Sequence, residues 1–119
     1  MLKGGQPEPP VIVVMSCGAD AVVNEVLAGI EEEGVPAVVE HRRDDQDAHA
    51  LARLAAQVST LEVGVGIDAL GRISVAHQKV TGATPGLFSG AAAPAEVARA
   101  LGHNAARIVV GVPLRAVAP

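Results

Sequence analysis

Phe88 is the only aromatic residue in this chain of 119 residues, which has neither Trp nor Tyr. Half of the residues are nevertheless hydrophobic, so a single core can form, but its side chains must be almost entirely aliphatic. Ala, Val and Gly predominate. This composition is typical of helices that lie close to a small sheet, and the length suits one ordinary domain.

Apolar segments with strand and helix periodicity alternate along the chain. We expect strands at residues 11–15, 36–40, 61–68 and 72–79, with a further short one at 86–89. We expect helices at residues 21–33, 48–58 and 94–110. Asp20 is the expected N-cap of the first helix, Gly34 its stop, Pro94 the first residue of the last helix, and Gly102 a point where that helix can bend. This order predicts an α/β domain of three layers, with a four- or five-stranded sheet flanked by helices.

Residues 61–68 alternate strictly between apolar side chains and a second set that contains Gly64 and Gly66. The two glycines lie inside a strand rather than at a strand-to-helix turn, and no third glycine follows at the spacing of a dinucleotide fingerprint. We therefore expect them to let a helix approach the sheet closely. A turn at residues 68–71 makes the next strand a hairpin partner, so the sheet should be mostly parallel but mixed.

Charge and cysteine content restrict the environment of the chain. The formal net charge is −4 and there are only two lysines, which argues against a nucleic-acid partner. No apolar run reaches the roughly 18 residues of a membrane span. Cys17 is the only cysteine, so no internal disulfide can form. Residues 1–10 are polar and Pro-rich and resemble no signal peptide, so we expect a flexible tail, a single domain over 11–119, and a cytoplasmic protein.

The chain contains no pattern that predicts catalysis or a bound cofactor. It has no phosphate-binding loop of the P-loop type. The four histidines are far apart and lack paired cysteines, so we expect them at the surface or half-buried; they are His41, His49, His77 and His103. Cys17 follows the first strand, and we interpret it as a small buried hydrophobic residue. Residues 41–45 carry mixed charges and suit a solvated turn.

Glu31, Glu32 and Glu33 form an acidic run in the last turn of the first predicted helix. Carboxylates there oppose the helix dipole, and at about 100° per residue they cannot all face one neighbour. The run is either a solubilising end, or a site where one carboxylate meets a cation or a basic group of another chain. Arg99, Arg107 and Arg115 either pair with a partner or coat the final helix.

Four segments together resemble the small subunit of diol/glycerol dehydratase reactivase. They are residues 25–36 (EVLAGIEEEGVP), 63–68 (VGVGID), 75–79 (VAHQK) and 102–115 (GHNAARIVVGVPLR). The resemblance covers about residues 11–115. The loop at 41–45 contains less histidine than the family pattern, and residues 82–94 are unusually rich in Gly and Ala.

The resemblance implies a non-catalytic subunit of the reactivating factor for a coenzyme B12-dependent diol or glycerol dehydratase. In that family a large, chaperone-like subunit binds and hydrolyses ATP. The small subunit leaves it, the dehydratase medium subunit takes its place, and damaged cobalamin is released. The middle glutamate of the EEE string, here Glu32, reaches Mg²⁺ or Ca²⁺ held mainly by the large subunit, so Glu31, Glu32 and Glu33 are the expected interface. Association with a bacterial microcompartment and self-association of the isolated chain stay open.

Two other functions are compatible with parts of the sequence. One is a medium-subunit-like component of the dehydratase itself, although such subunits usually carry an additional N-terminal region. The other is an independent small-molecule enzyme, against which the lack of a nucleophile, a general base and a phosphate loop argues.

Overall fold

The computed structural model describes residues 9–79 and 87–117. The elements follow the order β1 (Ile12–Ser16), α1 (Asp20–Glu32), β2 (Ala37–His41), α2 (Ala48–Val58), β3 (Val63–Ile67), β4 (Ile73–His77) and α3 (Ala95–Val110). These bounds lie within two residues of the expected ones, and the α/β fold class is confirmed. None of the described helices is both long and apolar enough to cross a membrane.

The four strands form one mixed sheet in the order β2-β1-β3-β4. Strand β1 runs parallel to β2 and to β3, whereas β4 runs antiparallel to β3. The β3–β4 hairpin is closed at Asp68, whose N–H donates to the Arg72 carbonyl at 3.0 Å. Beyond β4, Phe88 makes a single antiparallel bridge to Ser74 in place of the expected fifth strand, and residue 86 lies outside the described residues.

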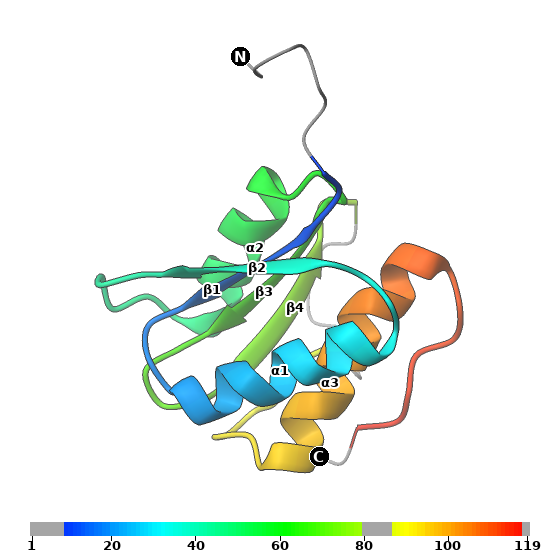
Figure 1. Cartoon of the computed structure of the whole chain (residues 1–119). Coiled ribbons are helices and arrows are strands. Elements are labelled where there is room, and N and C mark those ends of the chain that lie inside the picture. The colour runs from blue at the N-terminus through cyan, green and yellow to red at the C-terminus, as the bar shows by residue number, and fades with distance from the viewer. Residues whose placement is uncertain (1–8, 80–86, 118–119) are drawn as a thin grey trace.

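Helices cover both faces of the sheet, which gives the predicted three layers. Figure 1 shows α2 on one face and the neighbouring helices α1 and α3 on the other. The chain crosses the sheet in one direction from β1 to β2 and in the opposite direction from β2 to β3. Crossovers of the usual right-handed type therefore place α1 and α2 on opposite faces.

Strand β1 is buried on both faces and separates two apolar clusters. Ile12 and Val14 belong to the larger cluster, between the sheet and α1 and α3. Val13 and Met15 belong to the smaller cluster, which includes Leu51 of α2. A strand covered on both sides needs a continuous apolar sequence, which explains the unbroken run in β1.

Gly64 and Gly66 of β3 face α2, as the alternation predicted. A Cβ atom at Gly64 would lie 2.2 Å from the Ala56 amide nitrogen, and one at Gly66 would lie 2.1 Å from the Ala48 carbonyl oxygen. The helix therefore lies directly on the strand backbone, and only glycine fits at these two positions.

Glycine has the same role where α1 crosses α3. A Cβ atom at Gly102 would lie 2.2 Å from the Val26 carbonyl oxygen, and one at Gly29 would lie 2.1 Å from the Arg99 carbonyl oxygen. The helix α3 continues through Gly102 to Val110. Gly102 thus lets two backbones approach each other, which the sequence did not indicate.

Two helix starts differ from the expectation. Asp20 is the first residue of α1 rather than its cap; the N-cap is Ala19, with φ of 56° and no capping side chain. An acidic residue in the first turn still suits the positive end of the helix dipole. Pro94 is the N-cap of α3, which begins one residue later than expected. Gly34 has φ of 79° directly after the end of α1, so it is the predicted stop.

We expect Gly102→Ala to destabilise the domain by about 1–3 kcal/mol because the new methyl group meets the backbone of α1, which cannot move alone. This loss outweighs the gain in helix propensity of about 1 kcal/mol. The measurement is urea unfolding. Gly90→Ala is the control, since a Cβ atom there would meet nothing within 4 Å. Equal stability of the two variants would contradict the close contact between α1 and α3.

Candidate interaction site between helices α1 and α3

Charged side chains of alternating sign line the contact between α1 and α3. Arg99, His103 and Arg107 follow one another at four-residue spacing, so they share one face of α3. The carboxylates that face them come from Glu25 and Glu32 of α1 and from Glu33, the C-cap of that helix. We call these six residues the α1–α3 charge row.

The contacts of the charge row connect the six side chains into one chain of interactions. At its first end, Arg99 Nε lies 3.1 Å from Glu25 Oε1 and Arg99 Nη1 lies 3.4 Å from Glu32 Oε2. In the middle, His103 Nε2 lies 2.8 Å from Glu32 Oε1 and His103 Nδ1 lies 2.6 Å from Glu33 Oε2. At its second end, Arg107 Nε lies 2.9 Å from the same Glu33 oxygen.

His103 is the most enclosed member, with 11% of its side chain exposed. Each of its ring nitrogens faces a carboxylate oxygen. A neutral imidazole donates from one nitrogen only, so both contacts are hydrogen bonds from the ring only when it carries a second proton. The ring is thus fixed between two carboxylates from the end of α1.

Glu33 is held in its ionised form by the basic groups of α3. The hydrogen bond from Arg107 is the largest cause, followed by that from His103, and together they lower the pKa of Glu33 below its ordinary value of 4.5. Its side chain is 16% exposed, compared with 48% for Glu32. Glu33 thus lies inside the contact, and Glu32 lies at its edge.

The carboxylates of Glu32 and Glu33 are compensated inside this chain, which neither reading of the acidic run anticipated. The dipole conflict at the end of α1 is offset by contacts with basic side chains of α3. The Glu31 side chain is exposed, and the described residues offer it no hydrogen bond or ion pair. The three carboxylates do not share one neighbour, as the helix geometry predicted.

Sequence reasoning missed His103 as a partner of the acidic run and left Arg99 and Arg107 undecided. The available signal was the four-residue spacing of the three basic side chains, which marks one helix face. The spacing does not reveal that α1 lies against that face, because the paired residues are about 70 positions apart in the sequence.

Glu32 is the most exposed carboxylate of the row, so it is the one most open to an additional ligand at the surface. Its two oxygens already accept hydrogen bonds from His103 and Arg99, yet about half of the side chain is exposed. The described residues contain no group of three or more His, Cys, Asp or Glu side chains that could hold a metal ion. A divalent cation at Glu32 would therefore need ligands from beyond the described residues.

The other candidate residues form local contacts. Cys17 is partly buried beside the smaller apolar cluster, and its Sγ donates to the Asp44 carbonyl at 3.0 Å. His49 Nδ1 lies 2.8 Å from Ser74 Oγ. In the loop after β2, the hydrogen bond from Arg42 is the main cause that lowers the pKa of Asp44 to about 2.

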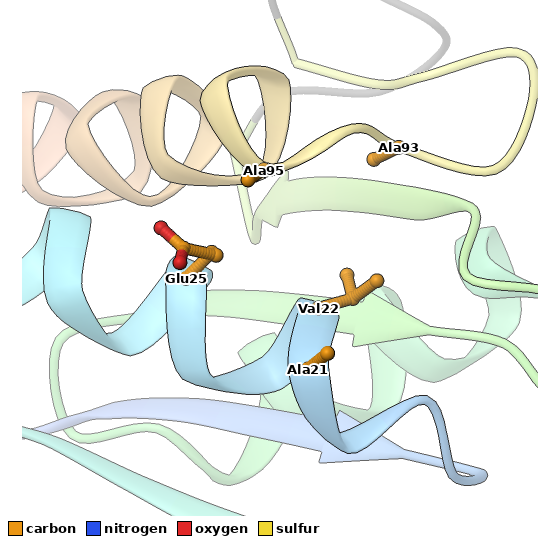
Figure 2. A pocket seen from close by; sticks show the side chains of 5 residues that line it. All are labelled: Ala21, Val22, Glu25, Ala93 and Ala95. Atoms are coloured by element: carbon orange, nitrogen blue, oxygen red, sulfur yellow. The ribbon is translucent and has the colours of Figure 1, made fainter.

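A shallow hollow of about 140 Å³ lies between the start of α1 and the segment that leads into α3 (Figure 2). Its lining consists of Ala21, Val22, Glu25, Ala93 and Ala95. Glu25, which is paired with Arg99, is the only polar side chain there. The hollow brings together no set of groups that would perform a reaction.

Comparisons with known proteins identify relatives of the whole described region. The family model of the dehydratase medium subunit matches residues 8–115. The diol dehydratase-reactivating factor small subunit of Klebsiella michiganensis is 34% identical over 115 residues, which are 96% of this chain and 90% of that protein. The probable glycerol dehydratase-reactivating factor small subunit of Citrobacter freundii is 36% identical over 92 residues, or 77% and 79% of the two chains.

Two solved structures have the same fold. A glycerol dehydratase reactivase chain superposes with a TM-score of 0.81 at 32% identity, covering 90% of this chain and 97% of that one. A chain of the diol dehydratase-reactivating factor complexed with ADP and Mg²⁺ superposes with a TM-score of 0.77 at 31% identity, covering 92% and 99%. The likeness thus extends over nearly the full length of both chains.

We expect Glu33→Gln to lower the stability of the domain at neutral pH, because the amide cannot replace the charge between His103 and Arg107. The pKa of Glu33 is lowered in the folded state, so its contribution is complete above about pH 4.5 and is lost as pH falls through the folded value. Urea unfolding between pH 7 and pH 3 measures this. The difference from the unmodified chain should shrink in acid. Glu31→Gln is the control; a deficit of Glu33→Gln that persists in acid would contradict the assignment.

Proposed function

The chain belongs to the family of dehydratase-reactivating factor small subunits, which is related to the dehydratase medium subunit, and we propose that it works by subunit exchange. In this proposal it is the accessory, non-catalytic subunit of the factor that reactivates a coenzyme B12-dependent diol or glycerol dehydratase. It changes places with the medium subunit of that enzyme, so that damaged cobalamin is released.

One observation carries the proposal: a single family model unites the two proteins that would exchange. The model that matches residues 8–115 is that of the dehydratase medium subunit, whereas the relatives at 34–36% identity are named as small subunits of reactivating factors. Two proteins of one fold can present similar surfaces to the same partner. Such likeness is what replacement of one subunit by the other requires.

In the proposed cycle, ATP hydrolysis takes place in the large subunit and not in this chain. A large subunit binds and hydrolyses ATP, releases this chain, and binds the medium subunit of the dehydratase. A solved relative contains ADP and Mg²⁺, which supports a nucleotide-binding partner. Intact adenosylcobalamin then enters the opened dehydratase. Exchange of this kind works when the two complexes have similar affinities, since each 1.4 kcal/mol of difference is about a tenfold bias.

Within this proposal Glu32 contributes one carboxylate to a Mg²⁺ or Ca²⁺ ion whose other ligands come from the large subunit. Both ions prefer oxygen ligands, and a half-exposed carboxylate can reach an approaching protein. Arg99 and His103 would orient that carboxylate before the partner arrives. We place the protein in the cytoplasm, and inside a bacterial microcompartment where its dehydratase is enclosed in one.

The alternative is that the chain is a medium-subunit-like component of the dehydratase itself. The match to the medium-subunit family model supports this alternative. The names of the relatives and the 90% coverage of the Klebsiella small subunit favour the reactivating factor. The two functions differ in the partner that this chain retains and in the place where cobalamin is found.

We expect exchange to be visible when the purified complex of this chain with the large subunit is mixed with inactivated dehydratase and ATP. This chain should separate from the large subunit, the medium subunit should appear in its place, and cobalamin should be released. Size-exclusion chromatography with mass spectrometry identifies the subunits, and absorbance follows the cobalamin. A sample without ATP is the control. Cobalamin release with this chain still bound would contradict exchange, and stable assembly with dehydratase subunits around bound cobalamin would support the alternative.

We expect Glu32→Gln to weaken Mg²⁺-dependent association with the large subunit about tenfold, or about 1.4 kcal/mol, because a neutral amide is a poorer cation ligand. Fluorescence titration of the large subunit measures this. Glu96→Gln, an exposed position in the first turn of α3, is the control. Unchanged affinity at saturating Mg²⁺ would contradict the metal role.

The same variant should be slightly less stable as an isolated domain. The position of Glu32 in the last turn of α1, where a carboxylate opposes the helix dipole, would by itself predict equal or higher stability. The contacts of Glu32 with His103 and Arg99 reverse this expectation. Partly exposed pairs contribute about 0–1 kcal/mol, so the loss in urea unfolding should stay within that range.

A further inference from the structure

Residues 111–117 follow α3 as an extended segment that turns back beside the helix (Figure 1), and we call them the C-terminal strap. Asn104, whose side chain is fully buried, holds the strap through both backbone polar groups of one residue, Arg115. Asn104 Nδ2 donates to the Arg115 carbonyl at 3.0 Å, and Asn104 Oδ1 accepts from the Arg115 N–H at 2.6 Å. This paired contact imitates the exchange of two hydrogen bonds between antiparallel strands.

Arg107 fastens the beginning of the strap and links it to the charge row. Its Nη1 donates to the Pro113 carbonyl at 3.1 Å, and its Nε donates to Glu33 at 2.9 Å. The Val112 N–H also donates to the Arg107 carbonyl at 3.2 Å. One guanidinium therefore joins the strap to the acidic end of α1.

The fastened strap and the end of α3 carry apolar side chains into solvent. Seven large hydrophobic residues are exposed among the described residues, and three of them lie within five consecutive positions. Val110 is 51% exposed, Val112 is 43% and Leu114 is 37%. Polar contacts that fix exposed apolar side chains do not contribute to the buried core. A concentration of exposed apolar side chains instead marks an interaction site.

We infer that the strap and the acidic end of α1 form one docking surface, joined by Arg107, for the large subunit of the reactivating factor. The inference rests on the proposed function and adds the apolar half of the interface. Its apolar part is the row Val110, Val112 and Leu114, and its acidic part is Glu31 and Glu32.

Charge favours the large subunit over a second copy of this chain. In a symmetric dimer the same patch occurs on both subunits, so one interface would contain the exposed carboxylates of both copies. Like charges placed opposite each other at an interface are unfavourable. A partner with an apolar patch and a cationic rim, or with a bound cation there, matches both parts of the surface.

Because Arg107 contacts both the strap and the acidic end of α1, we expect a change in one of them to alter the other. Loss of the Glu33 carboxylate removes the charge that holds Arg107 beside the Pro113 carbonyl, so the strap should loosen. Coupling free energy is reciprocal, so a partner that holds the strap also stabilises the acidic end.

Amide hydrogen exchange in the isolated full chain tests the coupling. The Arg115 N–H reports the docked strap because it donates to Asn104. We expect this amide to exchange about fivefold faster in Glu33→Gln, as for a weakened local hydrogen bond, and to be unchanged in Glu31→Gln. Equal protection in the two variants would overturn the role of Arg107 as the link.

Binding to the large subunit tests the surface. We expect Leu114→Ser to weaken the complex about tenfold, and Val58→Ser, an exposed position on α2 at the opposite face of the sheet, to change the affinity less than about twofold. Unchanged affinity of Leu114→Ser would overturn the inference. Dissociation of a homodimer by Leu114→Ser, with binding to the large subunit intact, would overturn the choice of partner. Failure of the unmodified chain to bind the large subunit would instead contradict the proposed function.

Discussion

The close approach of α1 and α3 is the constraint on which the candidate site depends. Gly29 and Gly102 lie where each helix meets the backbone of the other, at distances that leave no space for a methyl group. At this separation the side chains of Glu32 and Glu33 reach His103 and Arg107 directly. A larger separation of the helices would break these contacts. The carboxylates at the end of α1 would then lie at the negative end of the helix dipole without basic neighbours.

An aliphatic composition makes this architecture possible. Apart from Met15 in the smaller cluster, the buried side chains of the two apolar clusters are those of Ala, Val, Leu and Ile, and α2 lies directly on the glycine-containing strand β3. The C-terminal ends of β1 and β3, where α/β domains often bind ligands, are occupied by local turns instead. Asp68 at the end of β3 is buried and binds Arg72 and the backbone of its own turn. The features suited to interaction lie instead on the side of the sheet that α1 and α3 cover.

Local patterns in the sequence predicted most of the fold because they depend on neighbouring residues only. The alternation of residues 61–68 identified the core face of β3, and Gly34 marked the end of α1. The prediction that Asp20 is the N-cap of α1 was wrong. The N-cap is Ala19, whose left-handed backbone conformation cannot be predicted from its side chain. The pairing of Glu33 with His103 was not predictable, since it depends on which helices become neighbours. The resemblance identified the family, whereas the partners of Glu32 within the chain required the three-dimensional arrangement.

The charge row has a consequence for how easily this subunit separates from a partner. Carboxylates that depend on another chain for their counter-charges are left unpaired when that chain departs, and this raises the barrier to separation. Here Glu32 and Glu33 contact Arg99, His103 and Arg107 within their own chain. Departure of a partner leaves these two carboxylates with their internal contacts. Separation at the charge row therefore costs less than it would for carboxylates whose basic neighbours all belong to the partner.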